Sequence, residues 1–381
     1  MNNISRSIAG ALALLAAAAS TAAAQGTLTT QGFGYPPGQV SARAQATGTS
    51  FGEVDPHSPI NPASIIEFGR GSVYGQYSPE VRTVTTGGGS DRSTLTRFPV
   101  ASIAIPVRDR LMLGLSISTL LDRSWRTDST FVLGSGADTT TATASFGVSG
   151  AISDVRFAAA YQLHPRLRVG VGFHALAGRN NTSRDLIIAD TARFSSSRER
   201  DEFSFSGLGA SAGVEWRPSN VLAIAASART GGQMRAWRND SILTTSSFPR
   251  RAGASIIYSG LGGVAFAVRA DWEGWGRMEN LSRGDTPTFD AWEYSAGVEA
   301  KGPSLGETNV PLRAGFRHRT LPFGVAGGEK VTENSVMGGL ALPLARGRAG
   351  IDLTIQRDLR SAAGDAREKG WTFSTGLVVR M

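Results

Sequence analysis

The sequence predicts an all-β fold, a transmembrane antiparallel β-barrel of about 14 strands. Three observations predict it. From residue 65 onward, strand-like stretches are joined alternately by long polar segments and by short turns. Within these stretches apolar residues recur at every second position, as in strands with one apolar face. After residue 24 no stretch approaches the roughly 18 apolar residues of a membrane helix, so strands closed into a barrel are the remaining way to span a bilayer.

Residues 1–24 have the features of a secretory signal peptide. Arg6 supplies one positive charge, an apolar run follows from Ile8 to Ala19, and small residues precede Gln25 as a cleavage site. The apolar run is too short to anchor the chain in a bilayer. We therefore expect an exported protein whose mature chain starts at Gln25.

The strands that follow are placed by the alternation of apolar and polar residues. In the last one, Trp371, Phe373 and Leu377 share one face, whereas Thr372 and Ser374 lie on the other. The same pattern predicts strands near residues 65–78, 93–105, 110–122, 147–162, 167–179, 203–216, 221–230, 250–259, 263–272, 291–301, 310–319, 330–342, 347–357 and 371–381. The even count places both chain ends in the periplasm, and it places the long connections 123–146, 180–202, 231–249 and 273–290 outside the cell.

Two further signals agree with a barrel in the bacterial outer membrane. Tryptophans recur at predicted strand ends, which favours interfacial girdles over core filling: Trp125, Trp272, Trp275, Trp292 and Trp371 at the outer ends, and Trp216 at a periplasmic end. The last residues resemble the signal that barrel-assembly machinery recognises, although Met381 replaces the usual Phe. That machinery is thus an expected partner during biogenesis, beside outer-membrane lipid.

Composition excludes several classes of function. The formal net charge is +8, but the arginines are interleaved with acids and form no long run, so we expect no nucleic-acid partner. Contact with lipopolysaccharide phosphates is an alternative role for the loop arginines Arg184, Arg193, Arg235 and Arg238. Cysteine is absent, which excludes disulfides and thiolate metal sites. The mean hydropathy of −0.10 fits strands whose second face lines a polar lumen.

The segment 25–64 is rich in Gly, Pro, Ala and Ser and alternates poorly. It contains Ser41-Ala42-Arg43-Ala44, Gly48, Asp55-Pro56 and Asn61-Pro62-Ala63 in that order. This order resembles the N-terminal region of the FadL superfamily of outer-membrane transporters for long-chain fatty acids and other hydrophobic compounds, and of its PorV-like relatives. Later stretches, at 248–251, 311–317 and 321–323, are also similar, so the resemblance touches most of the mature chain.

The resemblance implies a 14-stranded barrel (residues 65–381) whose lumen is plugged by a short N-terminal hatch (residues 25–64), with Asn61, Pro62 and Ala63 at the junction with the first strand. It implies a channel for uptake of small hydrophobic molecules such as long-chain fatty acids. A PorV-like barrel that acts as a partner protein in secretion or surface attachment is the alternative function. A flexible periplasmic tail is the alternative interpretation of residues 25–64.

Charged residues occupy inward-facing positions of the later strands: Arg269, Asp271, Glu299, Arg313, Arg317, Arg319, Asp352 and Gln356. One interpretation is a network of ion pairs that braces the barrel or anchors the hatch. The other is an arginine cluster that receives a carboxylate head group. Arg313 and Arg317 are the candidates for that contact, since they project to the same side of one strand.

Catalysis and cofactor binding have little support in the sequence. The four histidines His57, His164, His174 and His318 are scattered, and none belongs to an HExxH or another metal-spaced pair. We therefore expect no enzyme activity, no cofactor and no metal site.

Overall fold

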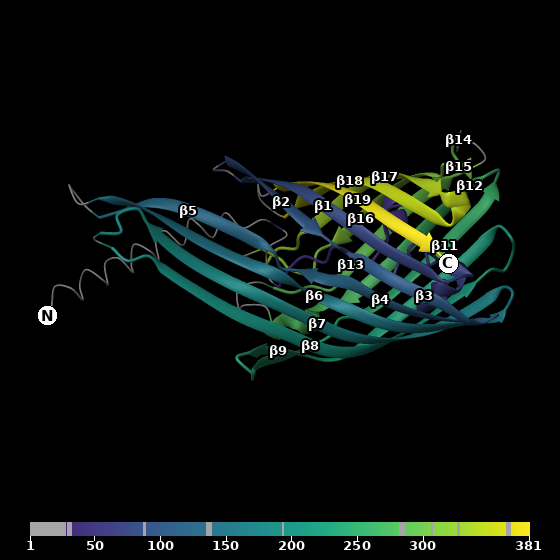
Figure 1. The fold of residues 1–381 in the computed structure, drawn as a ribbon, viewed down its shortest axis with the longest axis horizontal. Helices are drawn as coiled ribbons and strands as arrows, with labels where there is room; N and C mark the ends of the chain where they lie inside the picture. Colours follow the sequence, from purple (N-terminus) through teal and green to yellow (C-terminus); the bar gives the residue numbers. More distant parts are fainter. Residues whose placement is uncertain are drawn as a thin grey trace.

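The structure is a computed structural model that describes residues 28, 33–86, 89–134, 139–192, 194–281, 287–305, 308–325, 328–362 and 367–381. These residues form one closed antiparallel barrel around an N-terminal segment (Figure 1). The predicted signal peptide, residues 1–24, lies outside the described residues. Among the described residues no helix is long and apolar enough to cross a membrane.

The barrel has 14 spanning strands, as predicted. Three of them are split into two segments: β2 (Gly89–Arg97) with β3 (Val100–Arg108), β4 (Leu111–Asp122) with β5 (Trp125–Leu133), and β10 (Ser241–Ser247) with β11 (Arg250–Leu261). Two of the breaks fall at Pro99 and Pro249, because proline has no N–H to donate to the ladder.

The other strands are continuous. They are β1 (Ser72–Thr86), β6 (Thr140–His164), β7 (Leu167–Ile188), β8 (Ser197–Trp216), β9 (Leu222–Arg238), β12 (Val264–Gly274), β13 (Ala291–Ala300), β16 (Leu312–Thr320), β17 (Thr332–Leu344), β18 (Ala349–Ser361) and β19 (Arg367–Arg380). The first and last strands close the ring, with Ser72 opposite Arg380 and Thr85 opposite Arg367. A small hairpin, β14 (Ser304–Leu305) with β15 (Thr308–Asn309), lies in the connection from β13 to β16.

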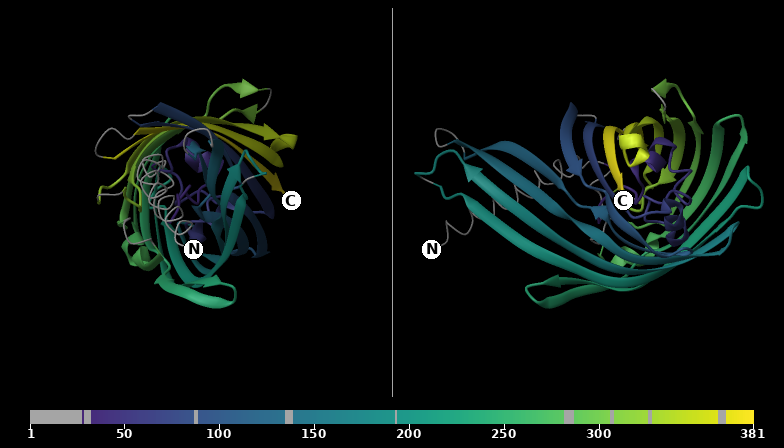
Figure 2. Two further views of the ribbon diagram at one scale, coloured as in Figure 1. Left: turned by 90° about the vertical axis from the view of Figure 1, so that its left-hand side faces the viewer. Right: turned by 45° about the vertical axis from the view of Figure 1, so that its right-hand side comes forward.

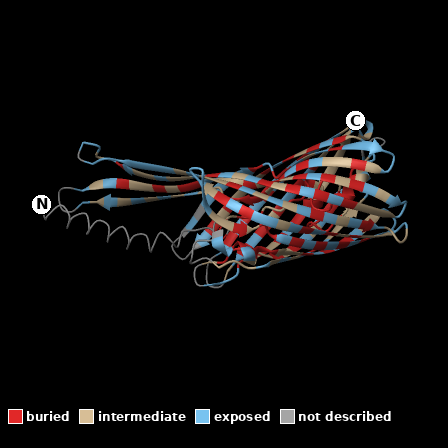
Figure 3. Ribbon diagram, turned by 90° about the horizontal axis from the view of Figure 1, so that it is seen from below, coloured by how far each residue is buried: buried red, intermediate tan, exposed pale blue. Residues whose placement is uncertain are grey.

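Burial alternates along the strands, as the sequence predicted (Figure 3). In β19 the apolar Trp371, Phe373 and Leu377 are exposed on the outside, whereas Thr372 and Ser374 are buried toward the lumen. The barrel therefore has an apolar outer surface and a polar interior, the arrangement expected of a protein that spans a membrane with strands.

The predicted first strand, 65–78, starts too early. Residues 62–68 form the short 3₁₀ helix η2 (Pro62–Phe68), which Asn61 caps at its start and Gly69 ends with φ 60°. Proline at the first turn and a left-handed glycine at the end favour a helical turn over a strand. The strand begins only at Ser72, so alternation alone misplaced the junction.

Three predicted long connections are largely β-structure. Residues within 123–146, 180–202 and 231–249 continue the ladders of β5–β6, β7–β8 and β9–β10. Polar residues interrupt the apolar ones in these hairpins, so no continuous apolar alternation marks them. In Figure 1, β5 to β8 extend well beyond the neighbouring strands. We call this the long-loop end of the barrel. The opposite end holds the C-terminus and the short connections, and we call it the short-turn end.

Candidate functional site

The N-terminal residues 33–68 lie inside the barrel, and we call them the hatch. Figure 2, left, looks along the barrel and shows this segment, in purple, within the ring of strands. Besides η2, the hatch contains one helical turn, α2 (Ala42–Ala46), whose N-cap Ser41 accepts a hydrogen bond from the backbone of Ala44. Most hatch side chains are buried, so the segment fills the lumen and is no loose tail.

Asn61, Pro62 and Ala63 rest on two glycines of the wall. The Asn61 Oδ1 accepts the backbone N–H of Ala63 at 2.9 Å. A Cβ atom at Gly213 of β8 would lie 1.9 Å from this oxygen, and one at Gly170 of β7 would lie 2.5 Å from the Ala63 nitrogen. Only glycine leaves room for so close an approach of two backbones. The three residues form the N-cap and the start of η2, which separates them from β1 at Ser72.

A second glycine platform receives the end of α2. A Cβ at Gly297 of β13 would lie 2.1 Å from the Thr47 carbonyl oxygen, and one at Gly315 of β16 would lie 2.1 Å from the Gly48 nitrogen. Gly48 itself has φ +68°, a backbone conformation that residues other than glycine rarely adopt. The hatch is therefore fitted to opposite parts of the wall through backbone contacts.

Ion pairs fix the hatch between these two platforms. Arg43 donates to Glu299 of β13 with its Nη2 at 2.9 Å. Glu53 accepts Arg251 Nη2 of β11 at 2.5 Å and Ser227 Oγ of β9 at 2.7 Å. Burial by itself would raise the pKa of the Glu53 carboxyl, but Arg251 and then Arg269 outweigh it and hold that pKa below its usual value. Glu53 is therefore an ionised anchor of the hatch.

Tyr35 joins the hatch to two further parts of the wall, β4 and β16 to β18. Its backbone pairs with Asp122 at the end of β4, with N–O distances of 2.8 Å in both directions. Its hydroxyl donates to Glu333 at 2.8 Å and accepts from Arg319 at 2.5 Å and Arg360 at 2.9 Å. Burial raises the pKa of the Tyr35 hydroxyl to about 12, against the lowering effect of the two arginines. Tyr35 thus stays a neutral donor within a charged network.

The predicted ligand contacts Arg313 and Arg317 are both buried and both engaged by protein carboxylates. Arg313 donates to Glu299 at 2.6 Å and to Asp352 at 2.5 Å. Arg317 donates to Glu333 at 2.8 Å. These contacts agree with one of the two interpretations of the sequence, a network of ion pairs that braces the barrel or anchors the hatch. A contact of either arginine with a ligand head group stays a prediction.

A polar chain that sequence reasoning missed runs across β6, β7 and β8. His174 Nδ1 lies 2.8 Å from Asp154 Oδ1, and its Nε2 lies 2.8 Å from Ser211 Oγ. All three residues occupy inward positions of neighbouring strands. The alternation of inward and outward positions along each strand, which we call strand parity, is therefore the signal that could have found them. The order of contacts is that of a catalytic triad. The backbone around Ser211 is paired with strands on both sides, however, so its N–H groups are committed to the ladder rather than to an oxyanion.

Within the part of the chain that the structure describes, no three His, Cys, Asp or Glu side chains are grouped so that they could hold a metal ion.

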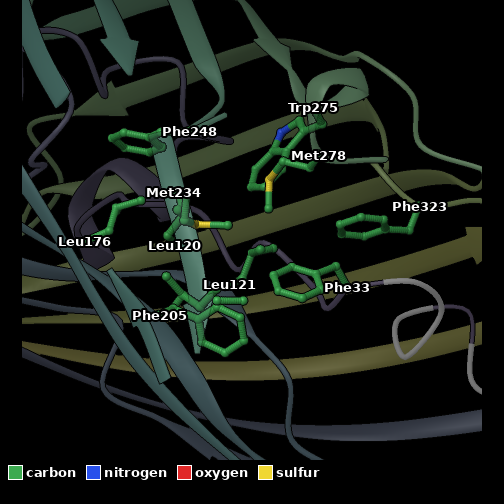
Figure 4. Close-up of a cluster of buried hydrophobic side chains, with 12 residues drawn as sticks. Phe33, Leu120, Leu121, Leu176, Phe205, Met234, Phe248, Trp275, Met278 and Phe323 are labelled. Atoms are coloured by element: carbon green, nitrogen blue, oxygen red, sulfur yellow. The ribbon is translucent and has the colours of Figure 1, made fainter. Parts of the chain in front are cut away.

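Toward the long-loop end, the lumen holds a cluster of apolar side chains above the hatch, which we call the apolar cluster (Figure 4). Trp275 and Met278 come from the short helix η3 (Trp275–Leu281) and are fully buried. Phe33 of the hatch meets Phe205 edge-on with ring centroids 5.4 Å apart. The remaining members are Leu120, Leu121, Ile152, Leu176, Met234, Ala236, Phe248 and Phe323. The apolar cluster is thus built from five strands, β4, β6, β7, β8 and β9, together with η3, the hatch and the segments that hold Phe248 and Phe323.

The space beneath the apolar cluster is small. A cavity of about 60 Å³ lies between the hatch and the wall and is lined by Gln39, Leu120, Trp275 and Arg251, among others. Sites for drug-sized ligands measure roughly 300–1,000 Å³. A larger pocket of about 310 Å³ opens beneath the hatch at the short-turn end, with an apolar floor that includes Phe51, Val54 and Ile257.

Fold and lumen together define a class of protein: a 14-stranded barrel plugged by its own N-terminal hatch. The chain is similar to the crystal structure of a FadL homologue from Pseudomonas aeruginosa, with a TM-score of 0.62 and 13% identity over 91% of this chain and 99% of that one. It is similar to the toluene transporter TbuX of Ralstonia pickettii, with a TM-score of 0.56 and 14% identity over 92% and 99% of the two chains. The toluene transporter TodX of Pseudomonas putida gives a TM-score of 0.56 and 13% identity over 90% and 98%.

At these identities the similarity shows the fold alone, and at that level it confirms the FadL-type barrel that the sequence indicated. The named neighbours are transporters or channel homologues rather than enzymes. No protein-family model matches the sequence, and no curated protein matches it.

Proposed function

We propose that this chain is an outer-membrane channel for the uptake of small hydrophobic molecules, with long-chain fatty acids as the first candidates. The observation that carries the proposal is the apolar cluster, since its 12 buried residues make it larger than the other apolar clusters of the described lumen, where many charged side chains are also buried. The solved toluene transporters with the same fold support the same class of ligand. An apolar molecule that leaves water for such a site gains the free energy of burying its surface.

In this proposal the long-loop end faces the exterior, where lipopolysaccharide surrounds it, and the short-turn end faces the periplasm, as in other barrels of this membrane. The ligand enters at the apolar cluster and leaves through the 310 Å³ pocket beneath the hatch or into the membrane. The barrel-assembly machinery inserts the protein, guided by the last strand, β19.

Entry depends on η3 in this proposal. Its Trp275 and Met278 side chains fill the cluster from above, while Trp275 Nε1 donates to Glu273 at 2.7 Å. The helix is held to β10 where Ser246 Oγ donates to the Arg277 carbonyl at 2.8 Å. Since the cavity below measures only about 60 Å³, a ligand must displace η3 to enter.

A reversible crosslink tests this route. The chain contains no cysteine, so a Ser246→Cys/Arg277→Cys pair would form the one disulfide and would tie η3 to β10. In liposomes that hold the purified protein, we expect uptake of radiolabelled oleate or toluene to stop in the oxidised pair and to return after reduction. Each single-cysteine variant is the matched control.

Uptake by the oxidised pair at the rate of the single variants would contradict entry at the apolar cluster. If the wild type takes up neither oleate nor toluene and co-purifies with an exported protein, the PorV-like role would be favoured instead. A carboxylate contact at Arg313 or Arg317 would appear as weaker retention of oleate, but not of toluene, in the Arg313→Ala/Arg317→Ala variant.

A further inference from the structure

Among the described residues of the lumen, one buried arginine has no carboxylate at close range. Arg156 projects inward from β6 and is only 3% exposed. Among the described residues its Nε and Nη1 atoms have no hydrogen-bond partner, and no carboxylate lies within the 4.0 Å of an ion pair. A guanidinium keeps its charge at any ordinary pH, so it cannot relieve this burial by losing a proton.

The nearest carboxylates are already engaged. Asp154 accepts His174 Nδ1 at 2.8 Å and Gln39 Nε2 at 3.0 Å. Glu53 accepts Arg251 and Ser227, as described above. The charged neighbours of Arg156 therefore include two further cations, Arg251 and Arg229, beside two carboxylates with other partners.

Arg229 of β9 differs in its charge pairing, since its Nη1 lies 3.5 Å from Asp154 Oδ2 and its Nη2 lies 3.6 Å from Glu273 Oε1, but it too has donors without a hydrogen-bond partner among the described residues. It is 6% exposed, and its Nη1 donates to Gln39 Oε1 of the hatch at 2.6 Å. Its Nε and Nη2 have no hydrogen-bond partner, because the nearest Glu273 oxygen lies 3.6 Å from Nη2. Two buried guanidiniums on one side of the lumen thus present donors that no protein acceptor satisfies.

We propose that Arg156 and Arg229 bind a small monovalent anion in the barrel wall beside the hatch. An anion supplies both the acceptor and the opposite charge that buried guanidiniums need, whereas water supplies only the acceptor. The site has room only for a small ligand, because neighbouring side chains pack closely around the two guanidiniums. A Cβ at Gly172 would lie 2.5 Å from Ser211 Oγ and 3.3 Å from Arg156 Cδ, and Gln39 covers Arg229 from the hatch side.

The site adjoins the apolar cluster without being part of it. The Arg229 guanidinium lies 4.5 Å from the ring centroid of Phe248, and Phe248 belongs to the cluster. A bound anion lowers the positive charge at this boundary. Its presence is independent of uptake, so the site can be tested separately from the proposed transport function.

Bromide is the probe, because it replaces chloride and scatters anomalously. In crystals of the full-length mature protein grown with sodium bromide, we expect an anomalous peak between Arg156 and Arg229 that is missing in Arg156→Gln. In detergent solution we expect a higher melting temperature in chloride than in gluconate at equal ionic strength. Arg156→Gln should lose this difference, whereas Arg313→Gln, which removes a carboxylate-paired arginine, should melt lower but keep it.

Competition by acetate distinguishes a site that also takes carboxylates from one that takes only halides. A bromide peak that acetate removes identifies a site that also takes carboxylates, and a peak that persists identifies a halide site. If Arg156→Gln does not fold, the wild-type crystals still decide. A wild-type map without a bromide peak, and equal melting temperatures in chloride and gluconate, would overturn the proposal, whatever the uptake assay shows.

Discussion

The two sides of the lumen differ in how buried charge is paired. On the side formed by β16 to β19, Arg317, Arg319 and Arg360 all donate to Glu333. On the side formed by β6 to β9, Arg156 is buried to a similar degree and contacts no carboxylate of the described residues. Burial therefore does not distinguish an arginine that braces the barrel from one that is available to a ligand, whereas its pairing does.

The largest effect is expected for Glu333→Gln. The substitution leaves three buried guanidiniums without their shared carboxylate, and breaking a buried ion pair costs about 3–5 kcal/mol. We expect a loss of this order in the free energy of unfolding in urea. Glu199→Gln is the control, because Glu199 is exposed and lies 3.9 Å from Arg184. An equally small effect of both substitutions would mean that the Glu333 network does not brace the barrel.

A smaller effect is expected for Gly213→Ala, which places a Cβ 1.9 Å from Asn61 Oδ1. Overpacking of this kind costs about 1–3 kcal/mol. We expect the hatch to shift while the barrel stays closed, seen as increased conductance in planar bilayers. Gly75→Ala in β1 is the matched control, since a Cβ there would meet nothing within 4 Å. Unchanged conductance in Gly213→Ala would show that the hatch tolerates displacement at Asn61.

A pH effect is expected from His57 of the hatch, which stacks on Tyr74 with ring centroids 4.7 Å apart. Burial lowers the pKa of His57; Asp55 and Asp352 oppose this effect, and Arg43 and Arg380 add to it. The folded-state pKa of His57 therefore lies below the unfolded value of about 6.5. The neutral imidazole makes its full contribution to stability above the unfolded pKa. This contribution is lost as the pH falls through the folded pKa.

The measurement is hydrogen exchange of the hatch amides between neutral and mildly acidic pH. Exchange should become faster at the acidic end after correction for intrinsic rates. The uncharged His57→Phe variant should lack this added acceleration. The same acceleration in both proteins would assign it to another group.

The smallest effect is expected for Arg156→Met in chloride-free buffer. Removing an unpaired buried cation also removes the cost of burying it, so the free energy of unfolding should stay the same or rise. Arg313→Met breaks contacts with Glu299 and Asp352 and should be clearly destabilising. Equal losses in the two variants would remove the distinction between the two sides of the lumen.

The sequence predicts the barrel well because strand parity is a local property. The inward faces of β18 and β19, the number of spanning strands and the lumenal hatch all agree with the structure. The hairpins at the long-loop end were missed because polar residues interrupt their apolar alternation. The start of β1 was misplaced because a capped 3₁₀ turn interrupts the pattern at Pro62.

The site is less predictable because parity tells which residues face the lumen and not what they meet across it. Arg313, Arg317 and Arg156 are all inward arginines in the sequence. Only the folded ring shows that the first two have carboxylates within 2.8 Å and that Arg156 has none. The contact of His174 with Asp154 and Ser211 depends in the same way on the register of three strands.

The hatch also spans the line along which the barrel is sealed. On one side of the junction between β1 and β19, the backbone N–H of Ala42 donates to the Tyr74 hydroxyl of β1 at 2.9 Å. On the other side, the carbonyl of the same residue accepts Thr354 Oγ1 of β18 at 2.7 Å. One residue of α2 thus connects the first strand with the second-to-last from within. The segment that obstructs the lumen is therefore also an internal clasp, and a hatch that leaves would loosen the ring at its seam.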